Sequence, residues 1–115
     1  MGKAHVFGFA TAERVFNLPC QFHLHMVADA TDALASAAST SLGFTTYTSN
    51  WQDIINDPAI GLVNITAPNA LHKEIALAAI AAGKHVYCEK PLAPSAHDSL
   101  EMTVAAERAG VKTQV

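Results

Sequence analysis

Three short stretches of the sequence carry side chains that could do chemistry, and each follows an apolar run. Asp29 ends the run HLHMVAD, where a carboxylate could accept hydrogen bonds from the ribose of an adenine nucleotide and would repel a 2′-phosphate. Asn69 and His72 stand in APNALH, directly after GLVNIT, at the predicted start of a helix. Lys90 stands in EKP, after HVYC, so a positive charge lies on a loop that proline stiffens.

Each of these stretches also has an ordinary structural interpretation. An aspartate after a strand commonly caps a helix or closes a turn, as Asp29 could. The APNALH stretch could be a routine strand-to-helix connection with Asn69 as its cap. A lysine such as Lys90 is often merely solvated. Any one of the three is therefore weak evidence, and their value depends on whether the fold brings them together.

The elements that must position these residues alternate along the chain. Helices are predicted over residues 2–16, 31–42, 51–56, 70–82 and 95–110, and strands over residues 23–29, 44–47, 61–66, 85–88 and 111–115. No repeat, linker or low-complexity segment interrupts them.

Local signals mark several of the predicted ends. Thr31 is expected to cap the second helix and Gly43 to end it, while Gly83 is expected to end the helix over 70–82. Ser95, with Asp98 three positions later, resembles a capping box for the last helix. In the helix over 70–82, the apolar stripe is expected to consist of Leu71, Ile75, Ala78, Ala79 and Ala82.

Strand and helix alternation with short connections predicts an α/β fold, with a parallel sheet covered by helices on both faces. Chemistry in such sheets takes place at the carboxyl ends of the strands, in the crevice where the strand order reverses. The stretches that contain Asp29, Asn69 and Lys90 all follow strands, so all three are expected at that crevice.

Composition narrows the classes of function. The chain has 115 residues, half of them apolar, with 15% charged residues and a net charge of −3. The sparse, scattered lysines and arginines argue against a nucleic-acid partner and against a membrane-surface partner. No leader or membrane-spanning segment is predicted, and two cysteines make no disulfide framework, so a cytoplasmic location is expected.

No metal site is predicted. His23 and His25 lie two residues apart and would share one face of a strand, but no third ligand with matching spacing follows. Cys88, at the end of an apolar strand, is interpreted as a small buried residue and not as a nucleophile.

The stretch TAPNALH, a helix, and then AGKHVYCEKPLA together resemble the Gfo/Idh/MocA family of NAD(P)-dependent oxidoreductases, which includes sugar and cyclitol dehydrogenases. The resemblance extends over all 115 residues. The opening MGKAHVFGF looks like the end of the family's G-x-G-x-M-G fingerprint. The family resemblance implies a Rossmann-like doubly wound sheet and hydride transfer between the nicotinamide cofactor and a small polyol or sugar.

The resemblance also implies a role for individual residues. Gly2 matches the last glycine of the fingerprint, and Asp29 matches the acid on the adenosine ribose, which favours NAD over NADP. Lys90 matches the lysine directed at nicotinamide and substrate, where it would stabilise alkoxide charge and take part in catalysis. The remaining matches to cofactor-binding loops are Thr66, Ala67, Pro68, Asn69, His72, Glu89 and Pro91.

The sequence departs from the family pattern at both ends. The first strand, the first two fingerprint glycines and the substrate domain are missing, so residues 1–115 are interpreted as a partial NAD(P)-binding Rossmann domain. Without the first strand, which lies centrally in the order 3-2-1-4-5-6, strands 23–29 and 61–66 are expected to face a gap. Weak or no NAD affinity is therefore expected for the chain in isolation.

The sequence also leaves open a function other than that of a dehydrogenase domain. The chain could be a non-catalytic nucleotide-binding or regulatory module, completed by another chain, or an inactive fragment. The sequence does not identify the substrate. The resemblance implies that the complete enzyme could form a homo-oligomer through its second domain.

Overall fold

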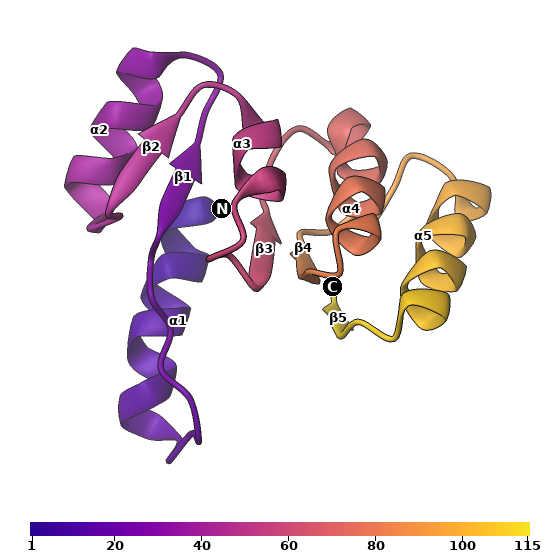
Figure 1. Cartoon of the computed structure of the whole chain (residues 1–115), viewed down its shortest axis with the longest axis horizontal. Helices are drawn as coiled ribbons and strands as arrows, with labels where there is room; N and C mark the ends of the chain where they lie inside the picture. The colour runs from indigo at the N-terminus through magenta and orange to yellow at the C-terminus, as the bar shows by residue number, and fades with distance from the viewer. The chain divides into compact units, whose positions relative to one another are not determined.

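The computed structural model describes all 115 residues and shows helices alternating with short parallel strands (Figure 1). The chain folds as two compact units, Met1–Trp51 and Gln52–Val115. The α/β class predicted from the sequence is therefore confirmed. No helix in the structure combines the length and hydrophobicity that a bilayer crossing requires.

The first unit contains a two-stranded parallel sheet and two long helices. Its elements are α1 (Gly2–Val15), β1 (Met26–Ala28), α2 (Asp32–Leu42) and β2 (Thr46–Thr48). β1 pairs with β2 so that Val27 lies opposite Tyr47, and α2 packs against both strands.

The ends of α2 follow the local signals in the sequence. The Thr31 hydroxyl accepts a hydrogen bond from the Leu34 amide at 3.3 Å. Gly43 ends the helix in the left-handed region, at a φ of 81°, which glycine adopts without the steric penalty of a side chain. Both predicted caps are confirmed.

The strand predicted over residues 23–29 is shorter than expected. β1 begins at Met26, so His23 and His25 precede it and do not share a strand face. The Leu24 and His25 carbonyls still accept hydrogen bonds from the first residues of the β2 segment, each at 3.0 Å. The regular ladder between β1 and β2 contains three residue pairs.

The second unit contains a three-stranded parallel sheet with its helices. Its elements are α3 (Trp51–Asn56, which begins at the unit boundary), β3 (Leu62–Ile65), the 3-10 helix η1 (Asn69–Leu71), α4 (His72–Ala81), β4 (His85–Cys88), α5 (Ala96–Ala109) and β5 (Thr113–Gln114). The strand order is β3-β4-β5, and Val63 lies opposite Val86.

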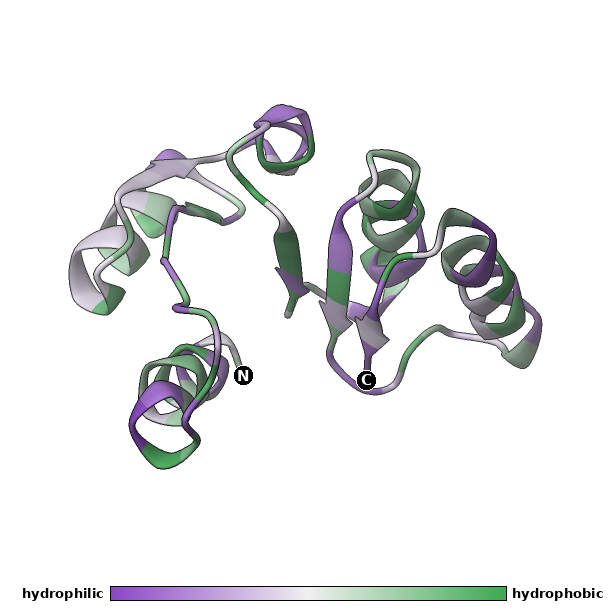
Figure 2. Ribbon diagram, turned by 60° about the horizontal axis from the view of Figure 1, so that its bottom comes forward, coloured by the Kyte–Doolittle hydropathy of each residue, from purple (hydrophilic) through white to green (hydrophobic).

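Helix α4 lies between the sheet and α5. It contacts β3, β4 and α5, and both helices lie on the same side of this sheet in Figures 1 and 2. Figure 2 shows α4 mostly in the hydrophobic colour, whereas α5 carries more hydrophilic residues. The core of the unit includes Val63, Ile65, Ile75, Ala76, Ala79, Ile80, Val86, Cys88, Met102 and Ala106.

The start of α4 differs from the prediction. Asn69 does not cap the helix, because the chain first makes the 3-10 turn η1 and α4 begins only at His72. The buried face is correspondingly shifted: Ile75 and Ala79 are buried as expected, but Leu71 and Ala82 are exposed. The end is as predicted, with Gly83 at a φ of 74°.

Capping of α5 follows the sequence closely. The Ser95 hydroxyl accepts a hydrogen bond from the Asp98 amide at 3.0 Å and donates one to the Asp98 carboxylate at 2.6 Å. Gly110, at a φ of 68°, ends the helix. The helix predicted from Ser95 to Gly110 is thus confirmed together with its cap at Ser95, although the Asp98 carboxylate accepts from the Ser95 hydroxyl and not from the Ser95 amide as in a full capping box.

The five strands form two sheets and not one. β1 pairs only with β2, and β3 pairs only with β4. That strands 23–29 and 61–66 face a gap stays a prediction. All pairs are parallel, as predicted.

Candidate functional site

The loops that follow β3 and β4 are neighbours at the carboxyl end of the second unit's sheet. β3 and β4 are adjacent parallel strands, with Ile65 opposite Cys88 at their ends. The pairing continues into the second loop, because the Glu89 amide donates a hydrogen bond to the Ile65 carbonyl at 2.9 Å. The stretches TAPNALH and EKP, separated in the sequence, are therefore brought together by the fold.

His72 connects these two loops directly. It is the first residue of α4, and only 2% of its surface is exposed. Its Nε2 lies 2.8 Å from the Ala67 carbonyl oxygen, and its Nδ1 lies 3.1 Å from the Pro91 carbonyl oxygen. Both ring nitrogens are thus engaged with backbone, and the imidazole has no polar atom left for a ligand.

The EKP loop presents Lys90 to solvent. The Glu89 Oε1 accepts a hydrogen bond from the Lys90 amide at 2.9 Å, which shapes the turn. The Lys90 side chain itself is exposed and makes no hydrogen bond or ion pair. The peptide bond between Lys90 and Pro91 is cis.

The loop after β3 contains a buried polar atom without a partner. Asn69 Oδ1 is buried and accepts no hydrogen bond. Thr66 and Ala67 are half-buried, and Pro68 is exposed. Leaving a buried acceptor unpaired costs folding free energy unless a donor reaches it. The Asn69 Oδ1 is therefore the atom of this loop best suited to bind a ligand.

Gly2 and Asp29 belong to the first unit, whereas the other predicted site residues belong to the second. Gly2 is the first residue of α1. Asp29 is exposed and directly follows β1, and its Oδ1 accepts a hydrogen bond from the Ala30 amide at 2.7 Å. One carboxylate oxygen therefore serves the turn, and the other stays available to an outside donor.

Cys88 behaves as the sequence predicted. Its side chain is buried at the end of β4, and burial, together with the nearby Glu89 carboxylate, raises the pKa of the thiol to about 11. A thiol held in its neutral form is a poor nucleophile, because the thiolate is the reactive species.

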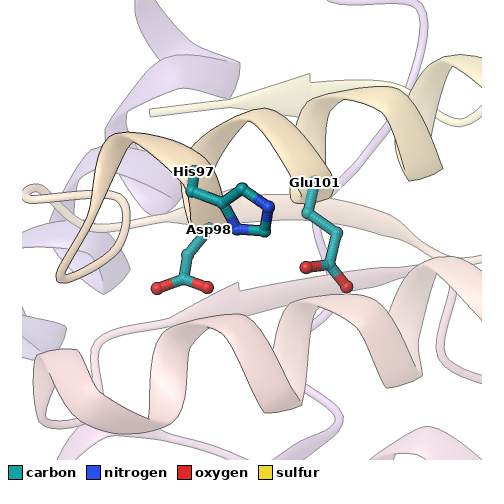
Figure 3. A group of neighbouring side chains, drawn as sticks. All are labelled: His97, Asp98 and Glu101. Atoms are coloured by element: carbon teal, nitrogen blue, oxygen red, sulfur yellow. The ribbon is translucent and has the colours of Figure 1, made fainter.

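A cluster of possible metal ligands lies on the first turns of α5. His97, Asp98 and Glu101 place ligand atoms within 4.8 Å of one another (Figure 3). The Lys73 ammonium, however, lies 2.6 Å from Asp98 and 2.7 Å from Glu101. A cation of the protein thus already pairs with the two carboxylates, and we interpret the group as an ion-pair network that joins α4 to α5.

A small cavity lies in the first unit. It measures about 250 Å³ and is lined by Phe9, Ala10, Glu13, Arg14, Phe22 and Leu24. This volume is below the ~300 Å³ at which ligand pockets usually begin. None of the predicted site residues lines it, so it has no part in the candidate site.

Sequence reasoning did not single out Lys84, which the structure shows to be buried. Its Nζ lies 2.7 Å from the carbonyl oxygens of both Asp57 and Ile60. These hydrogen bonds connect the turn before β3 to the turn before β4. The partners are backbone atoms 24 and 27 residues away, and no local pattern in the sequence reports such pairs.

Comparison with known proteins identifies the family. The model of the NAD-binding Rossmann domain of the Gfo/Idh/MocA oxidoreductase family matches residues 2–115. The chain belongs to this family. The resemblance inferred from TAPNALH and AGKHVYCEKPLA is thereby confirmed, as is the Rossmann fold.

Among curated Gfo/Idh/MocA relatives, levoglucosan dehydrogenase of Pseudarthrobacter phenanthrenivorans is 45% identical over 103 residues, which are 89% of this chain and 26% of the relative. An inositol 2-dehydrogenase/D-chiro-inositol 3-dehydrogenase of Lactiplantibacillus plantarum is 31% identical over 96% of this chain and 35% of its own length. The chain therefore spans about a quarter to a third of these relatives.

Solved structures agree with this assignment. An NAD binding oxidoreductase from Klebsiella pneumoniae superposes with a TM-score of 0.95 at 46% identity, over all of this chain and 31% of that one. A levoglucosan dehydrogenase in complex with NADH and levoglucosan superposes with a TM-score of 0.92 at 40% identity, over 98% of this chain and 31% of that one.

The residues of the chain fit the NAD that the family binds. Asn69 Oδ1 offers a buried acceptor, Asp29 has a carboxylate oxygen not used by the turn, and the Lys90 ammonium is unpaired. These are acceptors for the hydroxyl and amide donors of a dinucleotide and a cation for an electron-rich oxygen.

Proposed function

We propose that residues 1–115 form the NAD-binding part of a dehydrogenase that acts on a sugar, polyol or cyclitol. NAD, when bound, accepts or returns the hydride. The observation that carries the proposal is the arrangement of two neighbouring loops, one with the buried, unpartnered Asn69 Oδ1 and the other with the exposed, unpaired Lys90 ammonium. The relatives named above, a levoglucosan dehydrogenase and an inositol dehydrogenase, support the substrate class.

Asp29 is proposed to select NAD over NADP. Its free carboxylate oxygen would accept hydrogen bonds from the adenosine ribose hydroxyls, and its negative charge would repel a 2′-phosphate. A phosphate would also lack a cationic partner in the adjoining sequence, because no lysine or arginine lies between Arg14 and Lys73. A relative that uses NADP(+), the scyllo-inositol 2-dehydrogenase of Bacillus subtilis, shows that this preference varies within the family.

Lys90 is proposed to be the residue of this chain that takes part in catalysis. A positive charge next to the carbinol oxygen would stabilise the alkoxide that develops as hydride leaves the carbon. Glu89 and Pro91 would shape the loop, while Gly2, Thr66, Ala67, Pro68 and Asn69 would lie along the cofactor.

The proposal is testable by grafting this chain onto a relative. The corresponding segment of the Pseudarthrobacter levoglucosan dehydrogenase, 45% identical, is replaced by residues 1–115 in register. Binding of NAD⁺ and NADP⁺ is measured by calorimetry, and formation of NADH with levoglucosan is followed by absorbance. We expect NAD⁺-dependent turnover and a preference for NAD⁺ that Asp29→Ala reduces.

Lys90→Ala then separates the proposed roles. Loss of a charge that stabilises the transition state should lower kcat about 100-fold or more. The affinity for NAD⁺ should change little. Lys112→Ala, at an exposed lysine on the loop before β5, is the matched control and should leave both quantities unchanged. Equal losses of turnover and NAD⁺ affinity in Lys90→Ala would instead assign this lysine to cofactor binding.

A further inference from the structure

His72 lies at the junction of the two loops of the candidate site and is almost wholly buried. Its Nε2 faces the Ala67 carbonyl at 2.8 Å, and its Nδ1 faces the Pro91 carbonyl at 3.1 Å. A carbonyl oxygen can only accept a hydrogen bond, so the bond to either carbonyl requires an N–H on the ring nitrogen that faces it. The ring thus spans from the loop after β3 to the loop after β4, with one nitrogen facing each carbonyl.

Lys73, the next residue of α4, contacts the chain beyond the Lys90 loop. Its ammonium pairs with Asp98 and Glu101 at the start of α5. Two consecutive residues of one helix therefore fix residues 89–98 near both ends, His72 at Pro91 and Lys73 at Asp98.

The two contacts differ in burial, and therefore in how much each contributes to holding the segment. The Lys73–Asp98 pair is about 30% exposed on each side, where water screens an ion pair and its contribution is small. The His72 contacts are shielded, and loss of a donor there would leave a carbonyl unpaired. His72 is therefore the stronger of the two attachments.

We propose that His72 is a positioning residue that holds the Lys90 loop through its Nδ1 and is not itself a ligand of the cofactor. The consequence for catalysis rests on the proposed function of Lys90. The attachment of the loop by His72 does not depend on the proposed function, because it is a property of the chain alone and can be measured without a cofactor.

The two ring nitrogens can be replaced one at a time. The amide nitrogen of asparagine is as many bonds from the backbone as Nδ1, and that of glutamine as many as Nε2. His72→Asn thus retains a donor toward Pro91, whereas His72→Gln retains one toward Ala67. His72→Phe fills the space with a ring that donates nothing.

The test is amide hydrogen exchange on the whole chain, compared between the loop amides within residues 90–93, those of Lys90, Leu92 and Ala93 because proline has no N–H, and the strand amides of β4. In His72→Phe and His72→Gln, the amides of 90–93 should exchange about tenfold faster, as expected for the loss of one buried hydrogen bond. In His72→Asn they should stay close to the wild-type rate. Lys73→Met is the matched control and should affect residues 95–98 but not 90–93.

Equal acceleration in the Asn and Gln variants would overturn the proposal, since a residue that only fills space does not distinguish its two nitrogens. So would acceleration of the β4 amides by the same factor as the loop. If His72→Phe does not fold, the Asn and Gln pair still decides. Failure of the grafted enzyme to bind NAD⁺ would count against the proposed function and would leave this result untouched.

Discussion

Lys84 offers a quantitative test of how the second unit is held together. Only 6% of the residue is exposed, and its ammonium donates to the Asp57 and Ile60 carbonyls at 2.7 Å each. In Lys84→Met the aliphatic stem is retained and both donors are lost. The substitution therefore isolates the two hydrogen bonds from the packing of the side chain.

The expected loss of stability follows from these two contacts. A hydrogen bond from a charged group contributes about 1.5–3 kcal/mol, which gives roughly 3–6 kcal/mol for two. Methionine offsets part of this loss, because no ammonium then has to be buried. The Asp57 carbonyl can also turn to water, since that contact is only partly buried. We expect the free energy of unfolding to fall by about 2–4 kcal/mol.

Urea unfolding followed by circular dichroism measures this change, and exchange of the β3 and β4 amides assigns it to the second unit. Lys112→Met removes an exposed lysine and should change the free energy of unfolding by less than about 0.5 kcal/mol. If Lys84→Met matched that control with an unchanged dependence on urea, the two short contacts would not stabilise the unit, and the reasoning would be refuted.

Three further predictions concern capping, a carboxylate and a thiol. Ser95→Ala should lower the free energy of unfolding by about 1 kcal/mol in a urea titration, because the first turn of α5 loses its cap. The pKa of Asp98 is lowered by the hydrogen bond from Lys73 and then by that from Ser95, so its stabilising contribution is present above the ordinary pKa of an aspartate and is lost as the pH falls through the lowered value. Lys73→Met should raise this pKa in an NMR titration. Burial raises the pKa of Cys88 from 9.0 to about 11, so its contribution to stability is complete below pH 9 and is lost as the pH rises through 11. Ellman's reagent should therefore react at once with the exposed Cys20 and with Cys88 only after denaturation, and two fast thiols would contradict this.

The sequence by itself determined the features that depend on near neighbours in the chain. Helix α2 runs from its cap at Thr31 to Gly43, and α5 from Ser95 to Gly110, as predicted. A cap contacts amides two or three residues away, and a left-handed glycine ends a helix by its own backbone freedom. The family, too, was readable from AGKHVYCEKPLA, a contiguous stretch.

Only the tertiary structure decided which of these residues are attached to one another. Asn69 matched a helix cap by type and position, yet the 3-10 turn places its side-chain oxygen in a buried position without a partner. His72 matched a cofactor loop, yet its ring is enclosed by carbonyls 5 and 19 residues away. Lys84 reaches carbonyls that precede it by 24 and 27 residues. Such contacts form because parallel strands bring distant loops to one edge of a sheet, and no local preference of the chain encodes which atoms then meet.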